Sequence, residues 1–358
     1  MQIIQVKPEQ TLLQPEERLI KCVVWDLDNT IWQGILLEDA AVALRPGIVS
    51  IIKSLDERGI LHAIASRNDP QAAMRQLQQF GLADYFVYPQ IGWQAKSHSV
   101  TAIAQALNIG LDAIAFVDDQ PFEREEVAHA LPEVYCLDSA VVDEIPQMPA
   151  FMPRFITDDA RQRRQMIQAN IAREQAELSF DGPTETFLAT LQMVFTISRA
   201  QKEDLQRAEE LTRRTNQLNT TGYGYSYEEL LAVSRSPDHL LLIADLQDRF
   251  GGYGRIGLAL VECGTAIWNI KLLLMSCRVM SRGVGTILLT QIMRLAREAS
   301  TVLQAEFVAN DRNRMMFVTY RLAGFKCIKE DGSYSLLQHD LDEVSGFPEY
   351  INVVSRLS

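Results

Sequence analysis

Two pairs of aspartates occur in this chain, and each pair follows a short apolar run. Asp26 and Asp28 come after residues 22–25 (Cys-Val-Val-Trp), while Asp118 and Asp119 come after residues 113–117. Carboxylates that meet at one point repel each other unless a cation compensates them. Clustered oxygen ligands suit Mg²⁺, which keeps several waters and bridges to substrate phosphate. The two pairs therefore predict a magnesium site for chemistry on a phosphate.

Two further polar residues fit the same chemistry. Ser66 follows the second apolar run and offers a hydroxyl and a backbone N–H to phosphate oxygens, and Lys96, after Trp93, offers a point positive charge. Each piece alone is a weak signal, because an Asp-x-Asp pair often only caps a helix. The order Asp-x-Asp, Ser, Lys, Asp-Asp, with each member at or near the end of a predicted strand, is the specific signal.

The elements that must position these residues alternate between strands and helices. Strands are expected at 22–25, 60–65 and 113–117. Helices are expected at 46–58, from Pro70 to a stop before Gly81, at 97–108 and from about 123, with Pro46 at a first helical position and Asp69 as an N-cap. This alternation predicts a doubly wound, mostly parallel sheet. Ligands of such sheets lie beyond the carboxyl ends of the strands.

The chain changes character after residue 138. Residues 148–155 (Met-Pro-Ala-Phe-Met-Pro-Arg-Phe) predict a linker, and a helix with a heavily charged face is expected at about 157–178. A second α/β pattern begins at 186. Its strands are expected near 192–198, 240–246, 255–263, 267–274 and 303–308, and its helices near 201–211, 286–298 and 312–322. The predicted division is 1–145 for a phosphoryl-transfer domain, 146–185 for the linker and charged helix, and 186–358 for the second domain.

Composition limits the class of protein. The 358 residues are 47% hydrophobic and 22% charged, which is typical of globular domains. No run approaches about 20 apolar residues, and the first residues do not read as a secretory signal, so no membrane association is expected. The net charge of −12 argues against nucleic-acid binding. Five scattered cysteines without a CxxC pair argue against disulfides and structural zinc, and favour a cytoplasmic location.

The ordered set of polar residues resembles the haloacid dehalogenase superfamily. By this resemblance Asp26 attacks phosphorus and forms an aspartyl-phosphate, and Asp28 serves as general acid and base. Ser66, its neighbour Arg67 and Lys96 would hold the phosphoryl oxygens. The Mg²⁺ ligands would be Asp26, the backbone carbonyl of Asp28 and Asp118, with or without Asp119. Short spacings after Trp32 and after Gly81 leave no room for a large cap domain, so an open active-site mouth is expected.

The second half resembles Gcn5-related N-acetyltransferase folds. The resemblance rests on the glycine turn 282–285 before a helix and on the downstream stretch from Asn313 to Phe325. The basic residue that usually opens that turn would fall at Met280, so CoA binding does not follow from the fold. The fold class expected for the chain is α/β: a Rossmann-like haloacid dehalogenase domain with a minimal cap, followed by an acetyltransferase-like α/β domain.

Both halves together resemble one family, the FkbH-like proteins of polyketide biosynthesis. The resemblance rests on strings in both halves: residues 21–34, 66–69, 117–126, 214–217, 248–251 and 276–280. Gln33 stands where the family usually has glycine, and Arg67 where it usually has lysine. The resemblance implies an enzyme that takes a glyceryl unit from 1,3-bisphosphoglycerate, removes its phosphate and loads it onto the phosphopantetheine thiol of an acyl carrier protein.

Cys277 is the candidate carrier of the acyl group in that reaction. Arg278 and Arg282 are close in sequence and could lower the pKa of its thiol. The alternative is a buried structural cysteine, and Cys22 is interpreted in that way. Three other functions stay open: a stand-alone small-molecule phosphatase, a binding module without catalysis, and a CoA-dependent acyltransferase. Arginines at 161, 163, 164, 213 and 214 could form a basic patch for a carrier protein, or simply be solvated.

Overall fold

The computed structural model describes residues 18–215 and 217–357, apart from the side chains of Cys277 and Ser281. The chain forms two compact units, Met1–Arg164 and Gln165–Ser358, referred to as the first and the second domain. The change of unit falls near the start of helix α6 (Arg163–Leu178). In the described ranges, no helix combines the length and the apolar character needed to cross a bilayer.

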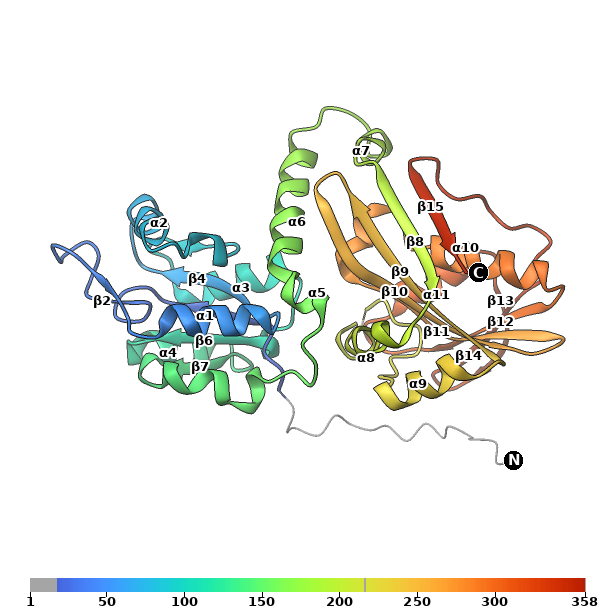
Figure 1. The fold of residues 1–358 in the computed structure, drawn as a ribbon, viewed down its shortest axis with the longest axis horizontal. Coiled ribbons are helices and arrows are strands. Elements are labelled where there is room, and N and C mark those ends of the chain that lie inside the picture. Colours follow the sequence, from blue (N-terminus) through green and yellow to red (C-terminus); the bar gives the residue numbers. More distant parts are fainter. Residues whose placement is uncertain (1–17, 216, 358) are drawn as a thin grey trace. The chain divides into compact units, whose positions relative to one another are not determined.

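The first domain is built on a sheet of parallel strands in the order β5–β4–β1–β6–β7 (Figure 1). These strands are β1 (Cys22–Trp25), β4 (Leu61–Ser66), β5 (Gln90–Ile91), β6 (Ile114–Asp118) and β7 (Tyr135–Asp138). All residues of β1, β4 and β6 are buried, as expected for central strands that are covered on both faces. The edge strand β7 is half-buried and has no clear sequence signal, so the sequence analysis misses it.

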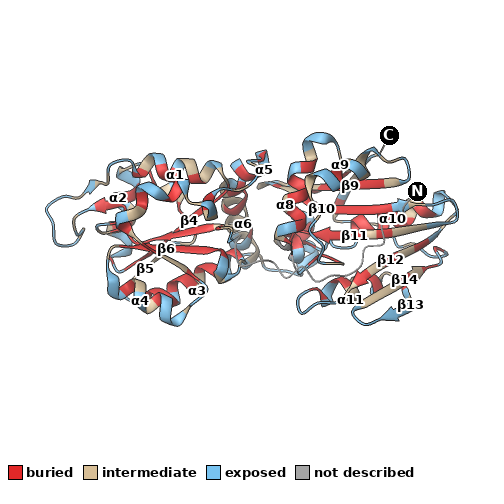
Figure 2. Cartoon of the chain, turned by 90° about the horizontal axis from the view of Figure 1, so that it is seen from below, coloured by how far each residue is buried: buried red, intermediate tan, exposed pale blue. Residues whose placement is uncertain are grey.

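Helices cover both faces of this sheet. Figure 2 shows α1 (Ile48–Glu57) and α2 (Pro70–Gln79) on one face, and α3 (Lys96–Leu107) and α4 (Pro121–Ala130) on the other. Helix α1 buries an apolar stripe at the spacing of one helix face. As predicted, the side chain of Asp69 caps α2 by accepting from the Ala72 N–H at 2.8 Å.

Two expectations for the first domain are wrong in detail. Helix α1 does not begin at Pro46, because Gly47 takes a left-handed conformation (φ 78°) and acts as the N-cap. The proline-rich segment 148–155 is not a free linker. The Phe151 side chain is fully buried in the first domain's core, and the Ala150 carbonyl accepts a hydrogen bond from the Ile20 N–H at 2.9 Å. Met148, Ala150 and Phe151 of this segment therefore pack in or against the core, whereas Met152 is exposed.

The connection between β1 and α1 contains a small hairpin, β2 (Trp32–Gln33) and β3 (Ala43–Leu44). The other connections carry short 3₁₀ helices: η1 (Ala83–Tyr85), η2 (Leu111–Ala113), η3 (Ser139–Gln147) and η4 (Pro149–Phe151). The described residues of the first domain therefore hold only a minimal cap, as the short spacings in the sequence predict.

The second domain is built on a mixed sheet in the order β13–β14–β12–β11–β10–β9–β8–β15. Neighbouring strands are antiparallel, except for the parallel pairs β11 with β12 and β8 with β15. The strands are β8 (Met193–Arg199), β9 (His239–Asp248), β10 (Gly251–Cys263), β11 (Ile267–Met275), β12 (Val302–Val308), β13 (Lys326–Asp331), β14 (Tyr334–His339) and β15 (Ile351–Arg356). The last three are absent from the sequence prediction, because their residues are mostly exposed or half-buried and give little apolar pattern.

The helices of the second domain flank the sheet. They are α7 (Thr184–Thr190), α8 (Leu205–Arg214), α9 (Tyr227–Arg235), α10 (Ile287–Glu298) and α11 (Arg314–Leu322). Helix α5 (Asp158–Arg161), which precedes α6, still belongs to the first domain. Two 3₁₀ helices, η5 (Lys202–Asp204) and η6 (Cys277–Arg282), precede α8 and α10. Residues of α10 and α11 contribute to the larger core, and residues of α8 and α9 contribute to a separate apolar cluster.

Strands β11 and β12 pair only at their first residues, as far as Ile270 and Ala305. Beyond that point the segment around Thr220 bonds to both strands. The Thr220 N–H donates to the Leu273 carbonyl at 3.1 Å, and the Thr220 carbonyl accepts from the Val308 N–H at 3.0 Å. Unpaired backbone groups are costly when buried. The Thr220 segment therefore supplies hydrogen-bond partners for backbone groups of β11 and β12 that no longer pair with each other.

Helix α6, for which the sequence predicts a heavily charged face, is partly buried. The Arg173 side chain, in α6, is 1% exposed and donates to both carboxylate oxygens of Asp248, at 2.7 and 3.0 Å. Its guanidinium carbon lies 3.8 Å from the centre of the Tyr253 ring, and the Tyr253 hydroxyl also donates to Asp248 at 3.0 Å. The buried charges are thus paired and hydrogen-bonded, which offsets the cost of removing them from water.

His62 is a fully buried residue of β4 whose ring joins two elements. Its Nδ1 accepts from the Trp25 indole N–H at 3.0 Å, so the other ring nitrogen carries the proton and donates to the Ile52 carbonyl at 3.0 Å. Burial lowers the pKa of His62 from 6.5 to about 4. The ring is therefore a neutral structural group, as the sequence analysis expects for a lone histidine in a strand.

We expect acid to destabilise the first domain through His62. Between pH 6.5 and 4 the unfolded chain binds a proton that the folded chain does not, so stability falls as the pH falls through this range. From pH 7 to pH 4.5 the wild-type protein should lose about 2.5 kcal/mol more stability than His62→Gln. Urea unfolding of both proteins at the two pH values measures the difference. Equal losses in the two proteins would contradict this account.

Candidate active site

The register of the central strands brings two predicted residues together. Trp25 of β1 pairs with Val117 of β6, so Asp26 and Asp118 follow on neighbouring strands. The Asp26 N–H donates to the Val117 carbonyl at 2.9 Å, which holds the start of the loop against β6. From β1 the chain continues to β4 and β5 on one side, whereas β6 and β7 lie on the other. This is the point where a doubly wound sheet opens a crevice for ligands.

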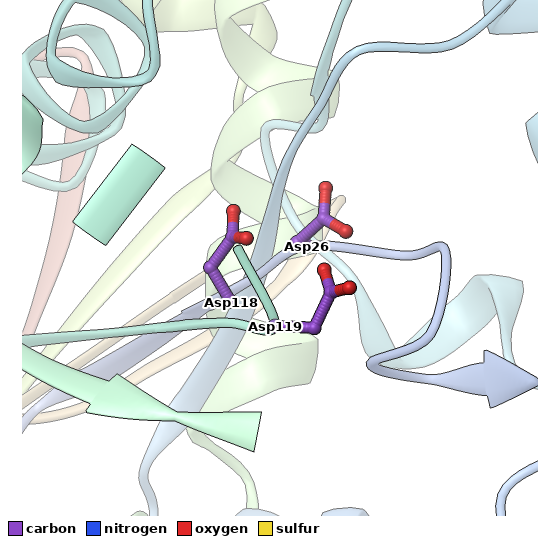
Figure 3. Close-up of side chains that lie close together, drawn as sticks. All are labelled: Asp26, Asp118 and Asp119. Atoms are coloured by element: carbon purple, nitrogen blue, oxygen red, sulfur yellow. The ribbon is translucent and has the colours of Figure 1, made fainter. Parts of the chain in front are cut away.

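Three carboxylates converge at this point. One carboxylate oxygen from each of Asp26, Asp118 and Asp119 lies within 4.8 Å of the others, and Figure 3 shows the three groups side by side. The ammonium of Lys96, at the start of α3, contacts Asp26 at 2.5 Å and Asp118 at 2.8 Å. Asp26, Asp118 and Lys96 are all buried. The structure therefore brings together four of the predicted site residues, Asp26, Lys96, Asp118 and Asp119.

The electrostatics of the cluster show an excess of negative charge. Burial is the main cause that raises the pKa of Asp26 to about 7; Lys96 opposes this rise, and Asp118 adds to it. Burial, and then Asp118, also raise the pKa of Asp119. Burial alone would lower the pKa of Lys96, but the Asp26 and Asp118 carboxylates raise it above its ordinary value. One lysine does not balance three carboxylates, so a further cation would stabilise the ionised cluster.

The cluster fits a divalent cation in a second respect. The Oδ1 atom of Asp119 is buried and has no hydrogen-bond partner in the described part of the chain. Buried carboxylate oxygens without a donor are costly, and a hard cation is a natural partner for them. Among the described residues, Asp26, Asp118 and Asp119 form the group of acidic side chains that meets this geometry. They are the residues that would hold the ion.

Asp28 lies apart from this group. Its Oδ1 accepts from the Trp32 indole N–H at 2.7 Å and from the Leu36 N–H at 3.0 Å, and its Oδ2 accepts from the Asn68 amide at 3.0 Å. The carboxylate of Asp28 is thus fixed by donors from the hairpin and from the loop after β4. Its carboxylate is absent from the convergent metal-binding group, and the sequence analysis likewise assigns only its backbone carbonyl to the ion.

Ser66 and Arg67 follow from the end of β4. The Ser66 side chain is buried, and the Ser66 carbonyl accepts from the Gly92 N–H at 3.0 Å, which joins this end of β4 to the segment before Lys96. The Arg67 side chain is 39% exposed and forms an ion pair with buried Glu123 at 2.9 Å. The guanidinium of Arg67 is therefore held by Glu123 of α4, and the phosphate-binding role of Arg67 stays a prediction.

The side chain of Cys277 lies outside the described residues, and only its backbone, at the start of η6, is described. The nearby Arg282 is buried and pairs with Glu177 at 2.9 Å. Burial raises the pKa of the thiol at each of the four described cysteines, most at Cys22 and to about 11 at Cys136; the other two are Cys263 and Cys327. These four are poor nucleophiles at neutral pH.

Two arginines of the proposed basic patch have partners within the first domain. The Arg163 guanidinium donates to the Gly59 carbonyl at 2.7 Å, and Arg164 pairs with Asp56 at 2.9 Å. The carbon of the Arg164 guanidinium also lies 4.6 Å from the centre of the Tyr85 ring. These contacts anchor the start of α6 to the first domain, so the two side chains already serve the fold.

Comparison with known proteins finds a family match within the first domain. The family model of haloacid dehalogenase-like hydrolases matches residues 34–125. The matched range contains Ser66, Lys96, Asp118 and Asp119, and it begins after Asp26 and Asp28. The first domain is thus a haloacid dehalogenase-like hydrolase domain. No curated protein matches the chain.

Solved structures resemble parts of the chain. The N-terminal part of BF1531 from Bacteroides fragilis, which contains a phosphatase domain and is complexed with Mg, is 28% identical with a TM-score of 0.34; the match covers 37% of this chain and 40% of that one. The PaiA N-acetyltransferase from Thermoplasma acidophilum, in complex with coenzyme A, is 22% identical with a TM-score of 0.33, over 40% and 97% of the chains. The ribosomal-protein-S18-alanine N-acetyltransferase from Escherichia coli is 16% identical with a TM-score of 0.32, over 40% and 90%.

The predicted fold class is confirmed. A Rossmann-like parallel sheet carries the haloacid dehalogenase-like hydrolase domain, and a mixed α/β domain follows it. The sequence analysis misses residues that hold the site in place: Trp32 and Asn68, which bind Asp28, and Glu123 and Glu126 of α4. They all lie in the family-like strings. The partners of Asn68, Glu123 and Glu126 are distant in sequence and cannot be deduced from spacing, whereas Trp32 lies only four residues from Asp28.

We expect Mg²⁺ to stabilise the wild-type protein through this cluster. A ligand that binds only the folded state at about 100 times its Kd adds about 2.7 kcal/mol. Asp118→Asn should lose most of this gain, because it removes one charged ligand. Asp112→Asn is the matched control, since Asp112 is exposed and precedes the other end of β6. Thermal unfolding with and without Mg²⁺ measures the gain, and an equal gain in Asp118→Asn would contradict a site at these residues.

Proposed function

We propose that the first domain is a Mg²⁺-dependent phosphatase in which Asp26 is the nucleophile. The observation that carries this proposal is the convergence of three carboxylates with Lys96 at the carboxyl end of β1 and β6. Bound Mg²⁺ would be held by Asp26, Asp118 and Asp119, and it would offset the negative charge of the phosphoryl group. Ser66 and Lys96 would bind the phosphoryl oxygens. An ammonium carries three N–H donors, and two of those of Lys96 are directed to carboxylates, so the third can bind a phosphoryl oxygen.

The reaction would proceed in two steps. In the first, an Asp26 carboxylate oxygen bonds to phosphorus, the ester P–O bond breaks, and Asp28 gives its proton to the leaving oxygen. In the second, water attacks the aspartyl-phosphate, Asp28 takes a proton from that water, and inorganic phosphate leaves with Asp26 restored. The contacts to Trp32, Leu36 and Asn68 would fix the direction of the Asp28 carboxyl group in both steps.

We further propose that the two domains together form a glyceryl–carrier-protein synthase. The long strings in both halves that resemble FkbH-like proteins support this assignment, and so does the pairing of a hydrolase domain with a second α/β domain. In the proposed reaction, the Cys277 thiolate attacks the acyl-phosphate carbonyl of 1,3-bisphosphoglycerate. The bond from that carbonyl carbon to the phosphate oxygen breaks, and inorganic phosphate leaves. The carrier-protein thiol then displaces Cys277 from the thioester, and the first domain hydrolyses the remaining 3-phosphate.

Cys277 is proposed for this role partly because the alternatives are weak. Burial raises the thiol pKa of the four other cysteines, all of which the structure describes, and this keeps them protonated at neutral pH. In the sequence, Cys277 is followed by Arg278 and Arg282, and positive charge near a thiol would favour the thiolate. A stand-alone phosphatase is the second candidate, and it would hydrolyse generic phosphomonoesters without a carrier protein.

We expect Asp26→Asn to abolish phosphate release while the fold is kept, since the substitution removes the nucleophile but not the volume of the side chain. Loss of 10³-fold or more is expected for removal of a nucleophile. The measurement is the rate of phosphate release from a phosphomonoester by the wild-type protein and by Asp26→Asn, with Asp112→Asn as control. Undiminished release by Asp26→Asn would exclude this residue as the nucleophile.

The synthase proposal requires a separate measurement. The protein is incubated with Mg²⁺, 1,3-bisphosphoglycerate generated in place, and a phosphopantetheinylated carrier protein, and intact masses are recorded. A glyceryl-sized increase on the carrier is expected, and it should be lost in Cys277→Ser. With Asp26→Asn, the carrier protein should instead keep the phosphate as a phosphoglyceryl adduct, or carry no adduct at all. Phosphomonoester hydrolysis without any adduct on either protein would leave only the phosphatase.

A further inference from the structure

Helix α3 begins without a capping residue of its own. Its N-cap is Ala95, which has no side-chain acceptor, although the first N–H groups of a helix need partners from outside the helix. Lys96, Ser97 and Ser99 in the first turn are buried. Water is therefore a poor substitute, and a buried N–H without a partner is costly.

The missing cap comes from another helix. The carboxylate of Glu126, in α4, accepts from the Ser97 N–H at 3.1 Å through Oε2 and from the Ser97 hydroxyl through Oε1. A carboxylate at a helix N-terminus is also favoured by the helix dipole. Glu126, which is 29 residues away in the sequence, thus takes the capping role that an aspartate or serine at the N-cap position usually has.

Helix α4 is itself fixed to the end of β6. The Arg124 guanidinium donates to the Asp118 carbonyl at 2.9 Å and pairs with Asp138 at 2.6 Å. Glu126 is two residues further along the same helix. The carboxylate that caps α3 is therefore tied to the strand end that carries Asp118 and Asp119.

We propose that Glu126 is a positioning residue that places Lys96 in the active site. Lys96 is the first residue of α3, directly before the capped Ser97, and its ammonium reaches Asp26 and Asp118. Successive helical residues are turned by about 100°, so a shift of the helix start by one residue would direct the lysine away from the carboxylates. This inference rests on the proposed function in one respect, namely that Lys96 binds a phosphoryl group.

A double-mutant cycle on the full-length protein tests the proposal, with binding of inorganic phosphate in the presence of Mg²⁺ as the readout. We expect Glu126→Ala to weaken phosphate binding about tenfold, and to add less than twofold in a Lys96→Ala background. Glu126→Gln should stay within about threefold of the wild-type protein, because its amide oxygen can still accept from the Ser97 N–H. Glu125→Ala, which removes an exposed carboxylate from the same helix, should change little.

The proposal is overturned if the effect of Glu126→Ala is equally large without Lys96, if Glu125→Ala has the same effect, or if the wild-type protein does not bind phosphate. Should Lys96→Ala fail to fold, the comparison between Glu126→Ala and Glu126→Gln decides, with both held below their melting temperatures. Phosphomonoester hydrolysis by the wild-type protein is measured in parallel. If the protein hydrolyses the phosphomonoester but the effects of Glu126→Ala and Lys96→Ala on phosphate binding are additive, only the positioning role of Glu126 is excluded. If the two effects are coupled but no hydrolysis occurs, only the proposed phosphatase activity is excluded.

Discussion

The repulsion among three converging carboxylates, two of them buried, is the constraint on which the first domain depends. Asp26, Asp118 and Asp119 meet at the end of two neighbouring strands, and a single lysine is buried with them. Such an arrangement is costly without a further cation. Burial, with a smaller contribution from Asp118, raises the pKa of Asp26. The geometry is therefore one that a bound cation would stabilise, as the proposed function requires.

Much of the surrounding structure keeps these groups in place. Helix α4 follows directly from the acidic pair, and its first two turns contact three segments: Glu123 pairs with Arg67 after β4, Arg124 binds the end of β6, and Glu126 caps α3. Each contact links a different strand end or helix start that carries a site residue. One helix thus sets the relative positions of groups that are far apart in sequence, as precise positioning requires.

The second domain solves similar problems by internal pairing. Its two diverging strands are joined through the backbone of Thr220, and its buried arginine in α6 is matched to Asp248 and covered by Tyr253. These networks are satisfied by the chain's own groups. In these two networks the buried charges and the backbone groups therefore have partners without a ligand.

The sequence by itself determined the local features: the buried strands before Asp26 and Asp118, the cap at Asp69, and the α/β order of both halves. These follow from short-range patterns of apolar residues and turn residues. Edge strands such as β7 and β13 escaped prediction because little of their surface is buried, and Phe151 escaped because its partners are distant. Only the tertiary structure decided that Glu126 caps α3, that Asn68 holds Asp28, and that Asp119 joins Asp26 and Asp118. The reason is physical: these contacts depend on the register of strands and the approach of helices, which local sequence does not encode.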